Sequence, residues 1–148
     1  MPSVEESITI NRKPEEVWDF LMQTENIPVV ESQVVTIDQI TDGPVAVGTR
    51  WKGTTKVLGR KLDWTTECVE LEPGVLAHHK TVEATLPFEI RWQLKPIGDG
   101  TEVTYRIDAE AGLGAVIGTM ADGLVMRAQR HTVRANLANL KELLEAEG

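Results

Sequence analysis

The segment from Gln33 to Glu110 alternates polar and apolar residues in six short runs, and this pattern constrains the fold more than any other feature. An alternation of period two is typical of strands that bury one face. Turn sequences such as DGP at Asp42 and GDG at Asp99 separate the runs, which predicts an antiparallel meander of hairpins. The runs are VVTIDQI, TRWKGTTKV, KLDWTTECVEL, VLAHHKTV, FEIRWQLK and EVTYRIDAE.

A long helical pattern follows the meander, from about Met120 to Glu147. Its apolar residues fall within one narrow arc when each residue turns the helix by about 100°. They are Met126, Val133, Leu137, Leu140 and Leu144. A single helix of this length after an antiparallel sheet must bury its stripe against that sheet.

A strand-like run and two short helical patterns precede the meander. SVEESITI alternates at its end and predicts the first strand. Pro14 begins the helical pattern PEEVWDFLM, where a proline loses no hydrogen bond and the following acidic residues suit the helix dipole. NIPVVES, around Pro28, predicts one more helical turn. The chain is therefore predicted to be a single α+β domain, residues 1–148, in which a curved seven-stranded antiparallel sheet surrounds the C-terminal helix.

The stretch AGLGAVIG, between the last strand and the long helix, has the glycine spacing of a phosphate-binding loop. A dinucleotide-binding fold needs a further strand after its helix, and none follows Gly118, so we expect no cofactor. Glycine leaves the backbone least restricted, so we interpret the segment as a hinge able to gate a cavity. Its glycines are Gly112, Gly114, Gly118 and Gly123.

The charge balance excludes some classes of partner. The net charge is −8, with 15 basic against 23 acidic residues, so the surface should repel nucleic acid and anionic membranes. No apolar run approaches the roughly 18 residues of a membrane span, and MPSVEESITI does not resemble a secretory signal. The single Cys68 permits no internal disulfide and suits a reducing compartment. We expect a cytoplasmic monomer or homodimer without integral membrane association.

Strand alternation places three tryptophans and the only tyrosine on one concave face. An aromatic-lined pocket for an apolar ligand is one interpretation, and ordinary core packing is the other. Polar residues that flank the helical stripe are candidates for contacts reaching into the pocket. The predicted ligand-binding residues are Trp51, Thr55, Trp64, Thr66, Trp92, Tyr105, Gln129, Thr132 and Asn136.

The adjacent His78 and His79 lie in a strand that sends one side chain inward and one to solvent. If Leu76 is the inward anchor of that strand, His78 faces the cavity and can act as an acid or a base near neutral pH. A hydrogen-bonded structural histidine is the alternative. We expect no metal, because neighbouring histidines on a strand point to opposite faces and no other ligand pattern accompanies them.

Several segments resemble the polyketide cyclase/dehydrase and lipid-transport family of the START-like, Bet v 1-like superfamily. They are VEESITINRKPEEVWDFL, VGTRWKGTTKVLGRKLDWTTECVELEPGVLAHH, GDGTEVTYRID and NLKELLE. The resemblance implies a helix-grip fold with an apolar cavity between sheet and C-terminal helix. Members bind lipids, sterols, polyketides or other hydrophobic ligands, and a minority catalyse cyclisation. Relatives often carry an aromatic residue after the proline of the second short helix, where this chain has Val29 and Val30.

Three hypotheses about function follow. The chain is a binding protein for a small hydrophobic ligand, or a polyketide cyclase/dehydrase in which Tyr105 and His78 transfer protons, or a protein-interaction module without a functional cavity. The volume of a cavity separates the third from the other two. A pair of titratable groups within hydrogen-bond reach inside the cavity would favour the enzyme.

Overall fold

The structure is a computed structural model that describes residues 3–57, 59–109 and 122–146. Its elements are β1 (Ser3–Ile10), α1 (Pro14–Leu21), the 3₁₀ turn η1 (Thr24–Asn26), α2 (Ile27–Val30), β2 (Val34–Gln39), β3 (Arg50–Val57), β4 (Arg60–Glu72), β5 (Leu76–Ala84), β6 (Phe88–Ile97), β7 (Gly100–Ala109) and α4 (Asp122–Ala146). None of the helices in these ranges is both long and apolar enough to cross a membrane.

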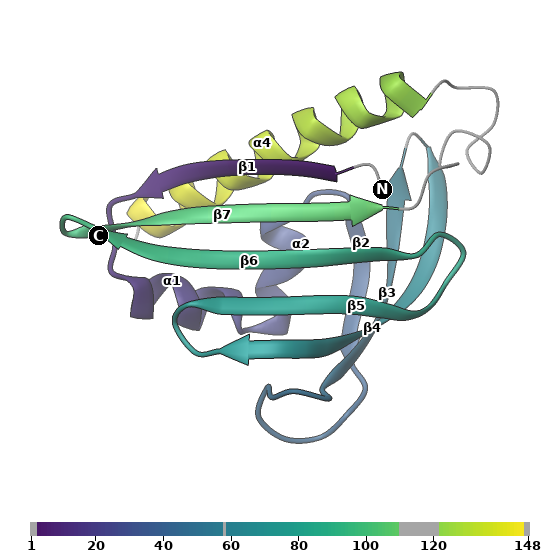
Figure 1. Ribbon diagram of the computed structural model, residues 1–148, viewed down its shortest axis with the longest axis horizontal. Helices are drawn as coiled ribbons and strands as arrows, with labels where there is room; N and C mark the ends of the chain where they lie inside the picture. Colours follow the sequence, from purple (N-terminus) through teal and green to yellow (C-terminus); the bar gives the residue numbers. More distant parts are fainter. Residues whose placement is uncertain (1–2, 58, 110–121, 147–148) are drawn as a thin grey trace.

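All seven strands form one antiparallel sheet in the order β1-β7-β6-β5-β4-β3-β2, as the alternation predicts (Figure 1). The six meander strands pair with their neighbours in the chain, and β1 pairs with β7. The β4–β5 register shifts twice, between Thr65 and Thr66 and between Cys68 and Glu70. Such irregularities bend a sheet, and Figure 1 shows β2 and β3 running across the direction of β6 and β7. The sheet is therefore curved, which confirms the predicted fold class.

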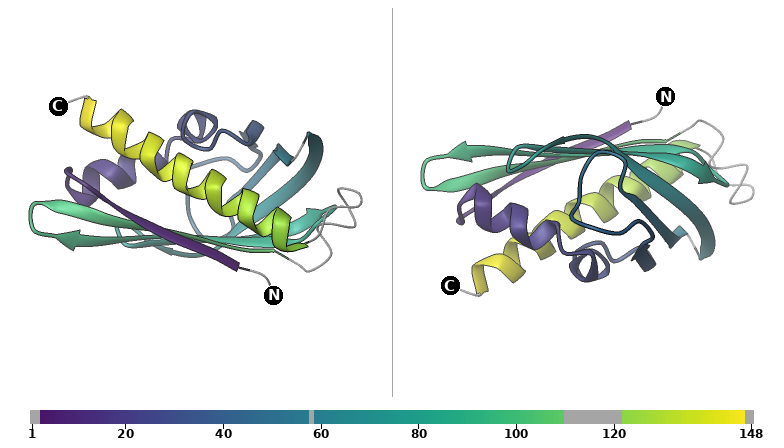
Figure 2. Two further views of the ribbon diagram at one scale, coloured as in Figure 1. Left: turned by 90° about the horizontal axis from the view of Figure 1, so that it is seen from above. Right: turned by 90° about the horizontal axis from the view of Figure 1, so that it is seen from below.

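The long helix α4 crosses the sheet diagonally and buries the predicted stripe (Figure 2). Val133, Leu137, Leu140 and Leu144 are buried in one cluster with residues of β1, β6 and β7. The C-terminal end of the helix is also tied to β1 and the turn after it. Lys141 Nζ donates to the carbonyl of Thr9 at 2.8 Å. The backbone N–H of Asn11 donates to Glu145 Oε2 at 2.9 Å.

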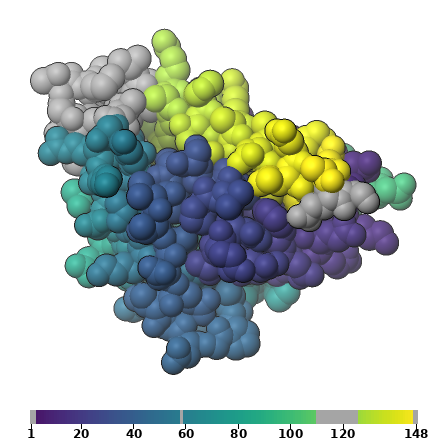
Figure 3. Space-filling view, turned by 180° about the vertical axis from the view of Figure 1, so that it is seen from behind, coloured from purple at the N-terminus to yellow at the C-terminus, as the bar shows by residue number. Residues whose placement is uncertain are grey.

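The segment between β1 and β2 covers the same side of the sheet as α4. Helix α1 begins at Pro14, as its pattern predicts, and it buries Val17, Trp18 and Leu21. Figure 3 shows α1 and α2, in purple and blue, lying against α4, in green and yellow. The predicted glycine hinge is not placed, because Gly112, Gly114 and Gly118 lie outside the described residues.

Candidate functional site

A pocket of about 220 Å³ lies between the inner face of the sheet and the segments that cover it. Its lining comes from β2 to β7, from α1 and α2 with their connections, and from α4. Aromatic and aliphatic side chains make up most of the lining. The inward-facing apolar side chains of the strands therefore line a pocket and also form a packed core.

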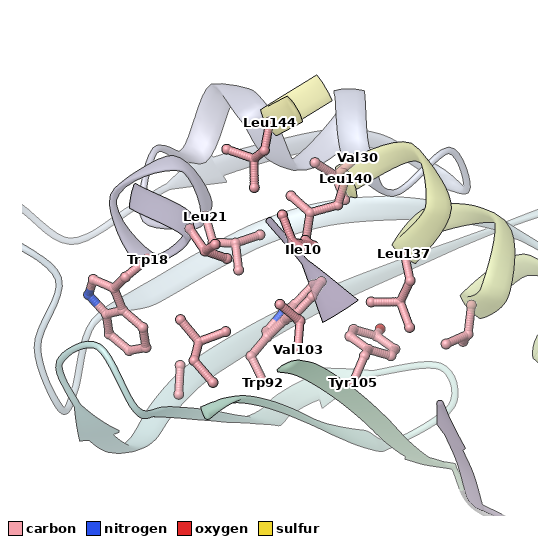
Figure 4. Packing of buried hydrophobic residues seen from close by; sticks show 14 of the residues in the cluster. Ile10, Trp18, Leu21, Val30, Trp92, Val103, Tyr105, Leu137, Leu140 and Leu144 are labelled. Carbon is pink, nitrogen blue, oxygen red and sulfur yellow. The ribbon is translucent and has the colours of Figure 1, made fainter. Parts of the chain in front are cut away.

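The three tryptophans predicted to face inward all line this pocket and are buried. Trp51 Nε1 donates to Thr24 Oγ1 at 3.2 Å, and Trp64 Nε1 donates to Thr55 Oγ1 at 2.8 Å. Trp92 packs edge-on against Tyr105 with ring centroids 4.7 Å apart, and Figure 4 shows the two side chains together on the sheet. These contacts fix the orientation of the rings, so they form a rigid aromatic wall.

Gly53 allows the Trp64 ring to lie against β3. A Cβ at this position would come within 2.5 Å of the Thr36 carbonyl oxygen and 2.6 Å of the Trp64 ring. Any larger residue would therefore displace the indole or the neighbouring strand. The absence of a side chain at Gly53 therefore helps to shape this wall of the pocket.

The polar residues predicted for the site divide into two groups. Thr55 and Thr66 line the pocket from the sheet, and Gln129 and Thr132 line it from α4. Asn136 does not appear in the pocket lining: it donates from Nδ2 to Gln33 Oε1 at 2.7 Å and accepts from the backbone N–H of Ser32 at 3.2 Å. The structure therefore does not place Asn136 among the residues that line the cavity. The side chain instead joins α4 to the connection between α2 and β2.

The prediction that His78 faces the cavity is also wrong, because the inward anchor of β5 is Ala77 and not Leu76. Ala77 is fully buried and pairs with Trp92. Directly paired residues of antiparallel strands lie on the same face, so the next inward position is His79. His79 lines the pocket, whereas His78 Nε2 lies 3.1 Å from Glu89 Oε1, outside the pocket lining. The structure therefore does not place His78 where it could transfer protons in the pocket.

His79 is an uncharged group under ordinary conditions. Burial lowers its pKa to about 4, and the charge of neighbouring His78 acts in the same direction. The ring meets Trp51 edge-on, with centroids 5.0 Å apart. Its buried Nδ1 has no hydrogen-bond partner among the described residues. The imidazole therefore offers the pocket a neutral polar edge.

The structure adds a residue that the sequence patterns did not indicate, Glu31. It follows α2 directly, and its backbone N–H donates to the carbonyl of Ile27 at 2.7 Å. Its side chain lines the pocket and the residue is only 5% exposed. Burial raises the pKa of this carboxyl to about 7, opposed by interactions with the Tyr105 hydroxyl and the Gln33 amide. The sequence around Glu31 looks like that of an ordinary surface segment, so no pattern marked this residue. The one available signal was Tyr105, because a buried phenol normally needs a hydrogen-bond partner.

Tyr105 completes a titratable pair with Glu31 inside the pocket. The residue is 3% exposed, and burial raises the pKa of its phenol well above the usual value, with the Glu31 charge and hydrogen bonding adding to the shift. The phenol therefore keeps its proton and can donate it as a hydrogen bond. From the other side, Gln33 Nε2 donates to Glu31 Oε1 at 3.4 Å. Asn136 holds that glutamine in place through its Oε1.

Among the described residues, the other charged side chains of the pocket lining lie at its edge. Lys56 and Asp63 contribute to its lining, and both are exposed. Within the described ranges, no group of three or more His, Cys, Asp or Glu side chains is placed to hold a metal ion. Cys68 is fully buried, and burial raises the pKa of its thiol.

The sequence matches a known family over almost its whole length. The family model described as polyketide cyclase / dehydrase and lipid transport matches residues 1–145. No curated protein shows a significant match to the sequence.

Solved structures share the fold at low sequence identity. A protein from Thermus thermophilus is 21% identical, with a TM-score of 0.81 and 99% of each chain covered. A START superfamily protein from Mycobacterium smegmatis is 13% identical, with a TM-score of 0.79 and 99% of each chain covered. The Zhui aromatase/cyclase from a Streptomyces strain is 16% identical, with a TM-score of 0.73, over 97% of this chain and 93% of that one. At these sequence identities, the comparison shows a shared fold and nothing further about function.

Proposed function

Because the chain belongs to the polyketide cyclase/dehydrase and lipid transport family, we propose that it binds a small hydrophobic ligand in the pocket between the sheet and α4. The observation that carries this proposal is an apolar pocket of about 220 Å³ with three tryptophans in its wall. Small-molecule sites are typically apolar cavities of roughly 300–1,000 Å³ with a few placed polar groups. The smaller volume favours a compact ligand over a long-chain lipid, and the pocket weighs against an interaction module without a cavity.

Ligand binding should change the intrinsic fluorescence of the protein. Decalol, a saturated bicyclic alcohol that does not absorb where tryptophan does, would displace water from the rings of Trp51, Trp64 and Trp92. We expect a change in tryptophan emission that saturates with decalol concentration. Native mass spectrometry of protein purified from its own host provides a second measurement, in which a retained small molecule should be displaced by decalol.

Matched variants separate the pocket from the rest of the core. Trp18 is buried against the sheet but is not part of the pocket lining. Trp18→Phe should therefore keep the amplitude of the decalol response, while Trp51→Phe should reduce it. A linear response without saturation, together with no retained small molecule, would contradict ligand binding.

A second candidate function is acid–base catalysis on a polyketide-like substrate, and the Glu31–Tyr105 pair favours it. A carboxyl whose pKa lies at about 7 can take up and release a proton near neutral pH. Glu31 would remove a proton from a carbon between two carbonyls, while Tyr105 donates a hydrogen bond to the enolate oxygen. Attack of that carbon on a third carbonyl forms a carbon–carbon bond and an alkoxide, which recovers the proton from Glu31.

The first step of that reaction is testable without the true substrate. A bicyclic β-diketone should exchange the hydrogen between its carbonyls with D₂O faster in the presence of the protein, at a rate that saturates with diketone concentration. Glu31→Gln should return the rate to the solvent background, as measured by NMR, while the diketone still binds. His78→Ala is the matched control, since His78 lies outside the pocket beside Glu89, and it should leave the rate unchanged. Equal exchange in wild type and Glu31→Gln would remove Glu31 as the base.

A further inference from the structure

We propose that the pocket selects uncharged ligands that carry a hydroxyl group and rejects carboxylates of the same skeleton, and that Glu31 makes this distinction. The inference rests on the proposed ligand binding and names the chemistry of the ligand. Among the described residues, Glu31 is the acidic side chain that is buried within the pocket lining, at 5% exposure. A hydroxyl group can donate to its carboxyl and accept from the phenol of Tyr105.

The elements around Glu31 present polar but uncharged partners. Tyr105 faces it from β7, and Gln33 faces it from the start of the chain segment leading into β2. On the α4 side, Asn136 binds Gln33, and Gln129 and Thr132 line the same pocket. His79, from β5, is neutral because burial holds its pKa at about 4. These neighbours accommodate a hydroxyl and supply no positive charge for an anion.

In the part of the chain that the structure describes, basic groups that could compensate a bound anion lie at the edge of the pocket or outside its lining. Lys56 is the one basic side chain, apart from His79, in the described part of the lining, and it is exposed at the edge of the pocket. Arg91 on β6 and Arg106 on β7 lie opposite each other in the strand register, and neither lines the pocket. Arg106 is bound there by Asp108, with Nε to Oδ2 at 3.0 Å. A carboxylate in the pocket would therefore meet Glu31 with no buried cation from the described residues between them.

The buried Gln129 Oε1 adds an independent reason to expect a hydroxyl. This acceptor has no hydrogen-bond partner among the described residues, and its side chain lines the pocket. A buried amide oxygen without a donor is costly. A reorientation of the amide toward a bound hydroxyl would supply that donor. A carboxylate has no proton to offer it.

The protonation of Glu31 gives the two ligand classes opposite responses to pH. Below a pH of about 7 the carboxyl is protonated, and a bound carboxylate meets no like charge. Above it, Glu31 ionises, and two carboxylates within about 4–6 Å disfavour one another. The affinity for a carboxylate should fall as pH rises, by at most about tenfold per pH unit. The affinity for an alcohol should hold or rise, because an ionised carboxylate is the stronger acceptor.

The experiment compares decalol with decalincarboxylate, which share one skeleton, by isothermal titration calorimetry of the wild-type protein. The measurements are made at about pH 6 and about pH 8.5, on either side of the pKa of Glu31. At the higher pH we expect decalol to bind at least about tenfold more tightly than decalincarboxylate. A tenfold ratio corresponds to the repulsion that would shift a pKa by about one unit. The ratio should shrink at the lower pH. This comparison needs no variant and so does not depend on a variant folding.

Two variants then assign the effect. Glu31→Gln keeps the shape of the side chain but removes its charge and its titratable proton. It should remove the pH dependence and raise the affinity for decalincarboxylate at the higher pH. Glu25→Gln, an exposed acid in η1 that does not line the pocket, should leave both affinities as in wild type.

The outcomes separate this inference from the proposed function. If decalol and decalincarboxylate bind equally at the higher pH, the selection is refuted while ligand binding stands. If the carboxylate binds more tightly and Lys56→Gln abolishes that preference, the pocket is a site for anions with their head group at its edge. If neither molecule binds at either pH, both the inference and the proposed function fail.

Discussion

The Glu31→Gln variant is expected to be more stable than the wild-type protein at high pH, by up to about 3 kcal/mol near pH 9, and equally stable near pH 4. Burial raises the pKa of Glu31 from 4.5 to about 7 in the folded protein. Each unit of difference between folded and unfolded pKa corresponds to about 1.4 kcal/mol. The rise of the pKa from 4.5 to about 7 therefore corresponds to roughly 3–3.5 kcal/mol, which is the maximum expected difference.

The sign follows from where the proton is held. Between the unfolded and the folded pKa, the folded protein keeps the Glu31 proton that the unfolded chain has released. The stability associated with this proton is complete below about pH 4.5 and is lost as pH rises through about 7. Glutamine carries no titratable proton, so the Glu31→Gln variant does not lose this stability as the pH rises.

Urea unfolding midpoints, measured from about pH 4 to about pH 9, would show the effect as a difference between variant and wild type. Glu25→Gln, in the same segment but exposed, is the matched control and should show no comparable growth of that difference with pH. A Glu31→Gln difference that stays constant over the whole range would mean that the carboxyl is not buried as described.

Leu137→Ala should lower the free energy of unfolding by roughly 2–5 kcal/mol, because it leaves a cavity in a packed core. Leu137 is 2% exposed in the middle of α4, and Figure 4 shows its side chain directed toward Tyr105. The loss combines the apolar surface no longer buried with the contacts left empty around it. It would be read from denaturant melts at one pH.

Glu142→Ala is the control on the same helix, since Glu142 is exposed. It should change the free energy of unfolding by no more than about 0.5 kcal/mol. A loss as small as this in Leu137→Ala would show that the buried stripe does not hold α4 on the sheet. It would also remove the helix as a wall of the pocket.

The sequence by itself determined the elements and their pairing. The alternation between Gln33 and Glu110 marked the strands of the meander, and the stripe from Met126 to Leu144 marked the helix that covers it. It also indicated that Trp51, Trp64, Trp92 and Tyr105 lie together. These features are readable because the period of an apolar pattern is a local property of the chain, set by backbone geometry.

The choice between the two adjacent histidines was decided only by the tertiary structure. Leu76 and Ala77 are both apolar, so the β5 pattern fits either face. The pairing of Ala77 with Trp92 turned His79 inward and His78 toward Glu89. A displacement of one residue reverses every side chain of a strand, and the irregular pairing of β4 with β5 is not encoded in the alternation.

The character of Glu31 and Asn136 also came from the tertiary structure alone. The neighbours of Glu31 along the chain do not distinguish it from a surface residue. The position of Asn136 beside the helical stripe suggested a contact with the pocket and not one with Gln33. Glu31 becomes a buried acid because β7 supplies Tyr105 and α4 fixes Gln33 through Asn136. Both of these elements lie far from Glu31 in the sequence, since five strands separate it from β7 and six separate it from α4. A pKa depends on the solvent and charges that surround the group in space, and the chain sets these only once it has folded.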